Sequence, residues 1–391
     1  VQESRRQDFR YKGLVSHLHG RGMVGFRQTA RSSWYSYSYP FYQTIIWSGA
    51  EMDPLQEGVP VKEWSIKTND ENLIFPSDIS VNNSQLLSFK STQYRNDALP
   101  YGVKALVPVT TTSKDFQRDI TTTSTVSAYN EYYLPTQTVS SINNGFATTT
   151  TNLEYLHNPG GTGKDYYIGR PKSKTETVQV YGDSKGAKED YEYENNLLKS
   201  KTSWNQNNSG WIRETYAYDG FGNTISKTIS NSTDGNTQSE SAQYEANGRF
   251  VVKKTDNLGL QTSISYNDWG QVLEQTDPLG NKLTNTYDAW GKMLTSKTNL
   301  GGTTTYTYEK FYNGDARITE YSPDGDEKAT YTNKIGQNYK TRVKSVNSGR
   351  YVAKDIQYDE LGRKTAESEP YYEGEGASKW NTIQYDEYSR P

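Results

Sequence analysis

The amino-acid sequence predicts an all-β protein built as a long antiparallel array of strand hairpins. Two observations lead to this fold class. A short pattern of tyrosine, an acidic or amide residue, two variable residues and glycine recurs through the second half of the chain. The segments between its copies are runs of about seven residues rich in Thr, Tyr, Val and Ile and bounded by Gly, Asp, Asn and Pro, as in strands joined by tight turns.

The composition excludes several classes of protein. The 391 residues include no cysteine, which rules out disulfides, thiolate zinc sites and a cysteine nucleophile. The 43 basic and 46 acidic residues leave a net charge of −3, which argues against nucleic acid as the main partner. Only 32% of the residues are hydrophobic, and no apolar run approaches the length of a membrane-spanning helix.

The repeat has recognisable anchor positions, each a tyrosine, acidic residue, glycine or arginine. These anchors are Tyr218, Asp219, Gly222, Tyr244, Gly248, Tyr266, Gly270, Tyr287, Asp288, Gly291, Tyr358, Asp359, Gly362 and Arg363. Degenerate copies begin at Tyr308, Tyr331 and Tyr385, and successive tyrosines are 21 to 27 residues apart. A second turn signal lies about midway between anchors, as at 277–280, so each repeat is expected to hold two strands.

Seven to eight repeats would supply about fifteen strands, and an open twisted sheet rarely exceeds about ten without curling or splitting. Two stacked sheets would need large aliphatic residues on one face of every strand, and the chain has few of them. We therefore expect a single coiled layer that encloses space, with tyrosines packed along it as cross-strand ladders. The alternative is a β-solenoid or propeller with a packed interior.

The chain is expected to contain three regions. Residues 1–125 form an N-terminal β region without a clear period, residues 126–210 an irregular repeat-like β region, and residues 211–391 the regular repeats. The chain starts with valine and stops inside a repeat, so we interpret it as a piece of a longer polypeptide. The best short helix candidate, 189–200, fits the repeat pattern equally well.

Motifs that would indicate catalysis or ligand binding are weak. Ser184 satisfies a nucleophile-elbow pattern, but no histidine follows it, so a hairpin turn is the better interpretation. The glycine-rich segment 160–164 lacks the required positions of a phosphate loop and is expected to be a polar loop. His17 and His19 share a strand face but have no evident third metal ligand. No catalytic residue, metal or cofactor is predicted.

Aromatic side chains raise the possibility of sugar stacking. If exposed, Trp34, Trp47, Trp204 and Trp211 would suit this role, and the alternative is ordinary cross-strand packing. In the tract 33–39 aromatic and small residues alternate, which puts its tyrosines on one face, either as core or as a contact for another segment.

Three segments resemble a known family. The Tyr-Asp-x-x-Gly units at 218, 287 and 358 resemble the YD repeats of rearrangement-hotspot (RHS) proteins. Residues 166–171 resemble a stretch early in the repeat region of the toxin-complex B component. Residues 11–26 resemble the Gly-Arg-Gly-x-x-Gly-Phe stretch near the start of the RHS region, with the matching residues Gly20, Arg21, Gly22, Gly25 and Phe26.

This resemblance implies a long antiparallel strand array of YD-repeat hairpins that coils into part of a hollow spiral shell. It also implies a non-catalytic shell segment of a larger secreted bacterial toxin-like protein, which encloses and protects a C-terminal effector polypeptide. The family's self-cleaving C-terminal core has no match here, so self-cleavage is not expected of this chain.

The expected partners are the rest of its own larger chain or a companion shell subunit, the enclosed effector and the secretion machinery, with no nucleic acid and no membrane span. A secreted or cell-surface location follows from the resemblance alone. The competing hypothesis is an extracellular adhesion or carbohydrate-binding β-repeat module, and an enzyme is the least favoured.

Overall fold

The computed structural model describes residues 5–17, 22–36, 45–345, 349–386 and 390–391. Strands make up nearly all of the regular structure in these ranges, which confirms the predicted all-β class. The helical elements described are single 3-10 turns, η1 (Glu71–Leu73), η2 (Pro100–Gly102), η3 (Asn143–Gly145) and η4 (Gly163–Asp165). In this part of the chain, no helix has the length and apolar character that crossing a membrane requires.

The chain divides into two compact units. Unit 1 comprises Val1–Thr215 with Ile229–Thr237, and unit 2 comprises Tyr216–Thr228 with Gln238–Pro391. The boundary is interleaved because strands β15 (Trp211–Tyr218) and β16 (Thr224–Asn231) each cross from one unit into the other.

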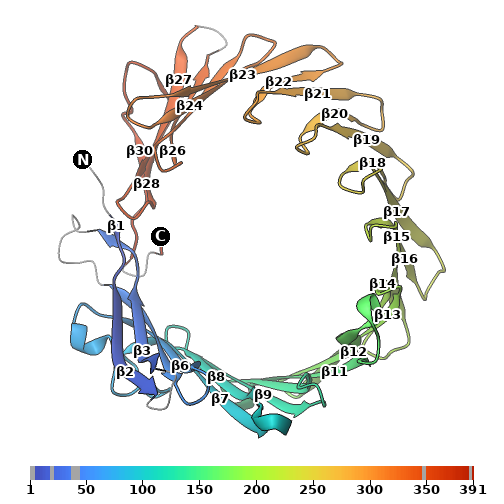
Figure 1. Ribbon diagram of the computed structural model, residues 1–391. Helices are drawn as coiled ribbons and strands as arrows, with labels where there is room; N and C mark the ends of the chain where they lie inside the picture. The colour runs from blue at the N-terminus through green and yellow to red at the C-terminus, as the bar shows by residue number, and fades with distance from the viewer. Residues whose placement is uncertain (1–4, 18–21, 37–44, 346–348, 387–389) are drawn as a thin grey trace. The chain divides into compact units, whose positions relative to one another are not determined.

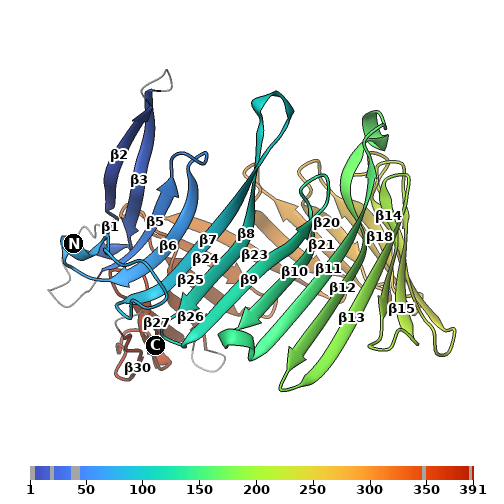
Figure 2. The same cartoon turned by 90° about the horizontal axis from the view of Figure 1, so that it is seen from below.

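Unit 1 is a succession of long antiparallel strands, nearly all of which pair with the next in the chain. Its strands before β15 are β1 (Arg5–Arg6), β2 (Phe9–His17), β3 (Gly22–Ser32), β4 (Tyr35–Ser36), β5 (Ile46–Asp53), β6 (Val59–Lys67), β7 (Leu86–Ala98), β8 (Lys104–Asp115), β9 (Ile120–Tyr129), β10 (Pro135–Ile142), β11 (Ala147–Asn158), β12 (Tyr167–Val180), β13 (Asp183–Glu194) and β14 (Leu197–Trp204). Figure 2 shows β7 to β13 side by side in chain order. The helix candidate 189–200 lies in β13 and β14, which pair as a hairpin, so it is not helical.

Unit 2 continues the hairpin pattern with shorter strands. They are β17 (Thr237–Tyr244), β18 (Val251–Thr255), β19 (Gln261–Tyr266), β20 (Val272–Thr276), β21 (Lys282–Tyr287), β22 (Met293–Thr298), β23 (Gly302–Lys310), β24 (Ala316–Tyr321), β25 (Glu327–Thr332), β26 (Asn338–Lys344), β27 (Tyr351–Tyr358), β28 (Lys364–Ser368), β29 (Tyr371–Tyr372) and β30 (Trp380–Thr382). From β17 to β28 each strand pairs antiparallel with its successor, and Figure 1 shows β18 to β22 in this order.

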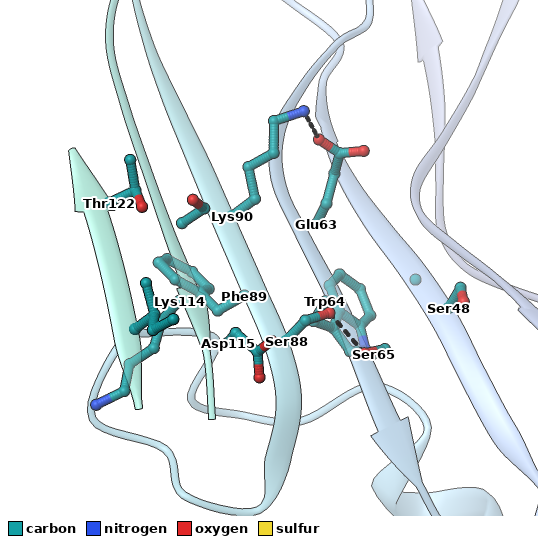
Figure 3. A pocket seen from close by; sticks show the side chains of 13 residues that line it. Ser48, Glu63, Trp64, Ser65, Ser88, Phe89, Lys90, Lys114, Asp115 and Thr122 are labelled. Atoms are coloured by element: carbon teal, nitrogen blue, oxygen red, sulfur yellow. Dashed lines mark hydrogen bonds and ion pairs between the residues drawn. The ribbon is translucent and has the colours of Figure 1, made fainter. Parts of the chain in front are cut away.

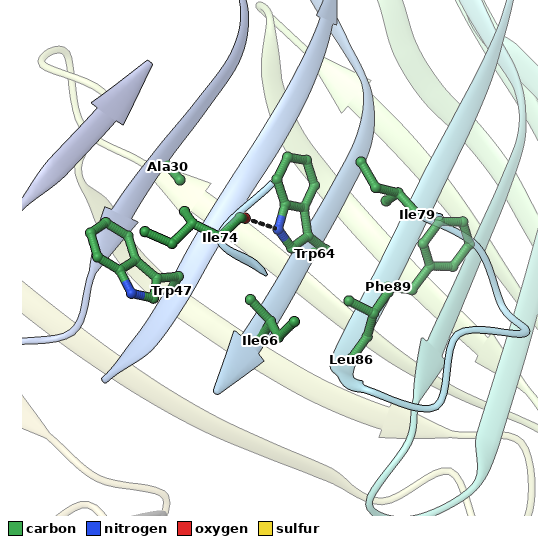
Figure 4. Close-up of a cluster of buried hydrophobic side chains, with 8 residues drawn as sticks. All are labelled: Ala30, Trp47, Trp64, Ile66, Ile74, Ile79, Leu86 and Phe89. Atoms are coloured by element: carbon green, nitrogen blue, oxygen red, sulfur yellow. Dashed lines mark hydrogen bonds between the residues drawn. The ribbon is translucent and has the colours of Figure 1, made fainter. Parts of the chain in front are cut away.

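A true hydrophobic core exists in unit 1 and was not predicted. The segment between β6 and β7 folds over one face of the sheet and contributes two of the buried side chains. The cluster consists of Ala30, Trp47, Trp64, Ile66, Ile74, Ile79, Leu86 and Phe89 (Figure 4). The indole N–H of Trp64 donates to the Ile74 carbonyl at 3.1 Å, which fixes the covering segment to the sheet.

This core decides between the two roles considered for Trp47. Only 3% of Trp47 is exposed, so its ring packs within the protein and is not available for sugar stacking. Trp34 is exposed, whereas Trp204 and Trp211 are half-buried. The indole N–H of Trp204 donates to Asp190 at 2.7 Å, so this ring is held within its own sheet.

Unit 2 has little comparable core. Among its described residues, the buried hydrophobic side chains are Ala329, Ala353 and Ala366. The chain as a whole exposes 25030 Å², whereas a compact monomer of 44.4 kDa would expose about 15,500 Å². Within unit 2 the strands therefore form a layer that is open to solvent, as the scarcity of aliphatic residues predicts.

The close packing of the unit 1 core gives a first prediction. A Cβ at Gly49 would lie 2.2 Å from Cζ2 of the buried Trp64 ring, so Gly49→Ala should cost about 1–3 kcal/mol of unfolding free energy through overpacking. Urea unfolding followed by circular dichroism measures this cost.

Gly186→Ala is the matched control. It is also a strand glycine, and its Cβ would meet nothing closer than 3.6 Å, so its free energy of unfolding should change by less than about 1 kcal/mol. Equal costs for the two variants would contradict the packing seen at Trp64.

Candidate functional site

The turn that follows each tyrosine anchor is the most regular feature of the chain, and the turn 288–292 represents it. The Asp288 N–H donates to the Lys292 carbonyl at 2.9 Å, and the Gly291 N–H donates to the Asp288 carbonyl at 3.0 Å. The Asp288 carboxylate accepts the N–H groups of Trp290 and Lys292 at 2.9 and 2.8 Å. Gly291 has a φ of 80°, which few other residues adopt without strain.

Other turns repeat this arrangement with Asp or Asn at the first position. Their capping residues are Asp219, Asp256, Asn267, Asp277 and Asn333, and each accepts backbone N–H groups two and four residues later. Glycine follows three residues after the cap in each, with a φ of 80° to 88° at Gly222, Gly259, Gly270, Gly280 and Gly336. The midpoint turns capped by Asp256 and Asp277 therefore share the geometry of these anchor turns.

Two predicted anchor turns differ in detail, one in the length of its loop and the other in an added side-chain contact. At Tyr244 the next residue is Glu245, and the loop is one residue longer because the Glu245 N–H donates to the Phe250 carbonyl. One carboxylate oxygen of Glu245 is buried without a hydrogen-bond partner. At Tyr358 the Asp359 carboxylate accepts the backbone N–H of Arg363 and also its guanidinium at 2.6 Å.

The tyrosine hydroxyls join neighbouring repeats. Tyr287 donates to the Val272 carbonyl at 3.0 Å, and Tyr308 donates to the Met293 carbonyl at 3.0 Å. Tyr358 and Tyr385 make the same bond to the Asn338 and Lys364 carbonyls at 2.8 and 2.9 Å. Each acceptor is the first residue of the strand that leaves the preceding anchor turn, so each hydroxyl links two successive repeats.

Three other anchor tyrosines contribute by packing. Tyr266 stacks on Phe250 with ring centroids 5.1 Å apart, and burial raises the pKa of its hydroxyl. Tyr218 lies beside Tyr216 at a centroid distance of 6.5 Å. Tyr244 ends β17 and is half-buried.

Successive anchor turns also contact one another directly. The side-chain amide of Gln271 donates to the Gly291 carbonyl at 2.7 Å, and that of Gln337 donates to the Gly362 carbonyl at 3.0 Å. Asn223 makes the same bond to Gly248 at 2.7 Å. These contacts align the anchor turns along one edge of the strand array, since alternate turns of an antiparallel sheet share an edge.

The hydrogen bond from a tyrosine hydroxyl to a backbone carbonyl of the neighbouring strand, here called the tyrosine clamp, recurs in unit 1, where the sequence showed no clear period. The hydroxyls of Tyr94, Tyr129 and Tyr155 each donate to the carbonyl of a proline, Pro60, Pro108 and Pro135 respectively. Asn130 caps its turn by accepting the N–H groups of Tyr132 and Leu134, both at 3.0 Å. The proline in the strand immediately before that of each tyrosine was the available signal, and sequence reasoning missed it.

The N-terminal family motif lies at the β2–β3 hairpin. Gly22 and Gly25 have positive φ angles of 64° and 140°, and a register shift interrupts the ladder at Val15. The Phe26 ring lies 4.9 Å from that of Tyr11. The other two motif residues, Gly20 and Arg21, lie outside the described residues, as do His19, Tyr37 and Tyr39.

The candidate catalytic and metal motifs are placed in structural roles. Ser184 follows the tight β12–β13 turn and pairs with Gln179, as the hairpin interpretation requires. His157 accepts the Gly169 N–H on Nδ1 at 3.1 Å and packs against Tyr132 at a centroid distance of 4.4 Å. The residues that the structure describes contain no group of three His, Asp or Glu side chains placed to hold a metal ion.

A depression of about 480 Å³ lies across β5 to β9, and it is lined by the rings of Trp64 and Phe89 as well as by hydroxyl and charged side chains (Figure 3). The hydroxyls of Ser65 and Ser88 lie 2.6 Å apart, and Glu63 forms an ion pair with Lys90. Glu63 and Ser65 alternate with Trp64 along β6, so they face away from the hydrophobic cluster. This face can exchange hydrogen bonds with a polar chain.

Charged side chains also line part of unit 2. Glu373 forms ion pairs with Lys340 at 2.7 Å and Arg342 at 3.3 Å, and Arg342 pairs with Glu327 at 2.7 Å. The Lys340 hydrogen bond is the main cause that lowers the pKa of Glu373 below its usual range. Tyr351 donates to Glu327 and stacks under the Arg342 guanidinium, so this network ties β25, β26 and β27 together.

Comparisons with known proteins agree on the repeat. Residues 244–282 match the family model described as RHS Repeat. No curated protein sequence matches the chain. Solved structures match over nearly its full length at low sequence identity.

A structure titled TcdB2-TccC3-TEV matches with a TM-score of 0.71 at 10% identity, covering 99% of this chain and 32% of that chain. TcdB2-TccC3 matches with a TM-score of 0.70 at 10% identity, covering 94% and 28%. A TccC3 variant of the Photorhabdus luminescens Tc holotoxin pore matches with a TM-score of 0.69 at 9% identity, covering 94% and 30%. The chain thus spans about a third of the length of these chains.

The turn geometry and these matches define the class of protein. Within residues 244–282 the chain carries a sequence that matches the RHS repeat. Its fold is that of the RHS shell in toxin-complex chains such as TcdB2-TccC3. The RHS shell is a structural rather than a catalytic element of its family.

The tyrosine clamp predicts a stability cost. Tyr287→Phe removes the hydroxyl and leaves the Val272 carbonyl without this donor, which should cost about 1 kcal/mol of unfolding free energy in urea. Tyr312→Phe, at a fully exposed tyrosine, is the control and should change it by less than about 0.5 kcal/mol. Indistinguishable variants would show that the clamp is not stabilising.

The capping carboxylates predict a local pH dependence. The Asn281 side-chain hydrogen bond, followed by backbone N–H groups, lowers the pKa of Asp277 below its usual value of about 3.9. The ionised cap therefore stabilises the turn fully above that value, and the contribution is lost as pH falls through the lowered folded-state pKa. Hydrogen exchange should show the protection of the Leu279 and Asn281 amides declining in this acidic range.

Asp277→Asn is the matched control because Asn267 and Asn333 cap equivalent turns in this chain. Its two amides should keep their protection as the pH is lowered. The same pH dependence in both proteins would assign the effect to groups other than Asp277.

Proposed function

We propose that the chain is a non-catalytic wall segment of an RHS shell, in which it surrounds and protects an effector polypeptide of a larger secreted bacterial protein. The observation that carries this proposal is a thin layer of strands with the RHS-shell fold. This layer presents hydroxyl, amide and charged side chains to solvent. Such a surface offers hydrogen bonds to a contained chain without an apolar lining on which it would collapse.

The anchors and regions fit this role. We propose that the anchor tyrosines, capping acids and turn glycines are structural, and that residues 211–391 form the regular wall. Residues 1–125 would lead into it, and residues 126–210 would form the less regular part. The companion would be a further shell segment, in the same polypeptide or in another subunit, because the chain spans about a third of the matched chains. Export through secretion machinery would follow from the toxin-like role.

Limited proteolysis of the complete gene product tests containment. Polypeptide enclosed by the wall should resist protease in the wild type. Asp277→Ala combined with Asp288→Ala removes the carboxylates that accept the backbone N–H groups of two turns, and it should make that polypeptide cleavable.

Asp324→Ala with Asp326→Ala is the control, because both are exposed acids of a turn but do not hold the capping position. It should leave the enclosed polypeptide protected. In the contrary outcome, the polypeptide outside the repeats is cleaved equally fast in the wild type and in both double variants. That result would contradict containment.

A further inference from the structure

Both edges of the unit 2 array carry exposed apolar residues. We call the edge formed by the anchor turns the anchor rim and the edge formed by the midpoint turns the midpoint rim. On the anchor rim, Trp269, Trp290 and Tyr312 occupy three successive turns and are 75%, 86% and 109% exposed. On the midpoint rim, Leu258, Leu279 and Leu300 occupy three successive turns and are similarly exposed.

The spacing of the aromatic residues is set by the sheet. Successive turns on one rim are two strands apart, which is about 9.5 Å at the usual strand separation. The Gln271 amide bond to the Gly291 carbonyl holds the turns of Trp269 and Trp290 together at this separation. The ring of Tyr308, just before the next turn, lies under the Lys292 ammonium at 5.2 Å, which joins the third turn to the second.

This pitch is close to the length of one disaccharide unit in an extended β-1,4-linked glycan. In such a chain alternate sugars are turned over, so the same flat C–H face recurs once per disaccharide. Aromatic rings stack on that face, and polar groups beside the rings can bond the equatorial hydroxyls. Asp268 and Asn313 are exposed next to Trp269 and Tyr312 and are suited to this task.

The spacing, rather than apolar character, argues for a sugar ligand. Exposed rings occupy three consecutive anchor turns, whereas the next anchor turn carries exposed Ile335 and lies outside the proposed site. Planar rings repeated at this pitch match a ligand that recognises flat faces. We propose that the exposed rings of Trp269, Trp290 and Tyr312 together bind an extended β-1,4-linked glycan along the anchor rim. Glycan binding here is independent of containment.

Isothermal titration of the 391-residue chain with cellohexaose and with chitohexaose tests the proposal. Each hexasaccharide spans three disaccharides and so can reach all three rings. At least one should bind, and at least about tenfold more tightly than its own disaccharide, because a disaccharide reaches only one ring. The arm that binds identifies whether the sugar carries hydroxyl or N-acetyl groups.

Trp269→Ala with Trp290→Ala should weaken hexasaccharide binding at least about tenfold. Leu258→Ala with Leu279→Ala, the matched pair on the midpoint rim, should leave it within about twofold. Circular dichroism shows that each variant keeps its strand content. Absence of binding to both hexasaccharides, or equal loss in the two double variants, would overturn the proposal. So would a tryptophan variant that loses only self-association, because the rim would then be a protein contact.

Discussion

The hydrogen bonds inside each turn are the interaction on which the rest of unit 2 depends. A carboxylate or amide at the first turn position binds two backbone amides, and a glycine with positive φ closes the loop, as at Asp277 and Gly280. Tyrosine hydroxyls and glutamine amides then bond each turn to its neighbour. Stability is therefore distributed along the array in nearest-neighbour terms, as in other repeat proteins.

The two units are stabilised in different ways. Unit 1 buries Trp47 and Trp64 under the segment between β6 and β7, whereas the described part of unit 2 buries little more than three alanines. A layer held by its turns does not need an apolar face, so both of its faces are free to carry polar side chains. This property suits a wall that touches solvent and polypeptide alike.

Sequence periodicity was sufficient for the fold class and for the turn positions, because the cap and the glycine form each turn within five consecutive residues. It could not reveal the unit 1 core, since Ile74 and Ile79 lie in a segment without a pattern and meet Trp64 only in three dimensions. For the same reason it could not decide whether Trp47 is exposed or packed. The proline carbonyls that accept Tyr94, Tyr129 and Tyr155 lie more than 19 residues away in sequence, beyond any local pattern.

The central claim is that turn hydrogen bonds, rather than a continuous apolar core, hold unit 2 together, and that the apolar core of unit 1 is a small cluster. Scanning calorimetry measures it directly through the heat capacity of unfolding, which rises with the apolar area that unfolding exposes. The usual heat capacity of unfolding is about 12–15 cal/mol/K per residue. The account predicts that this protein has about three quarters of that value. A value at or above that range would contradict it, because it would require a packed interior of ordinary size.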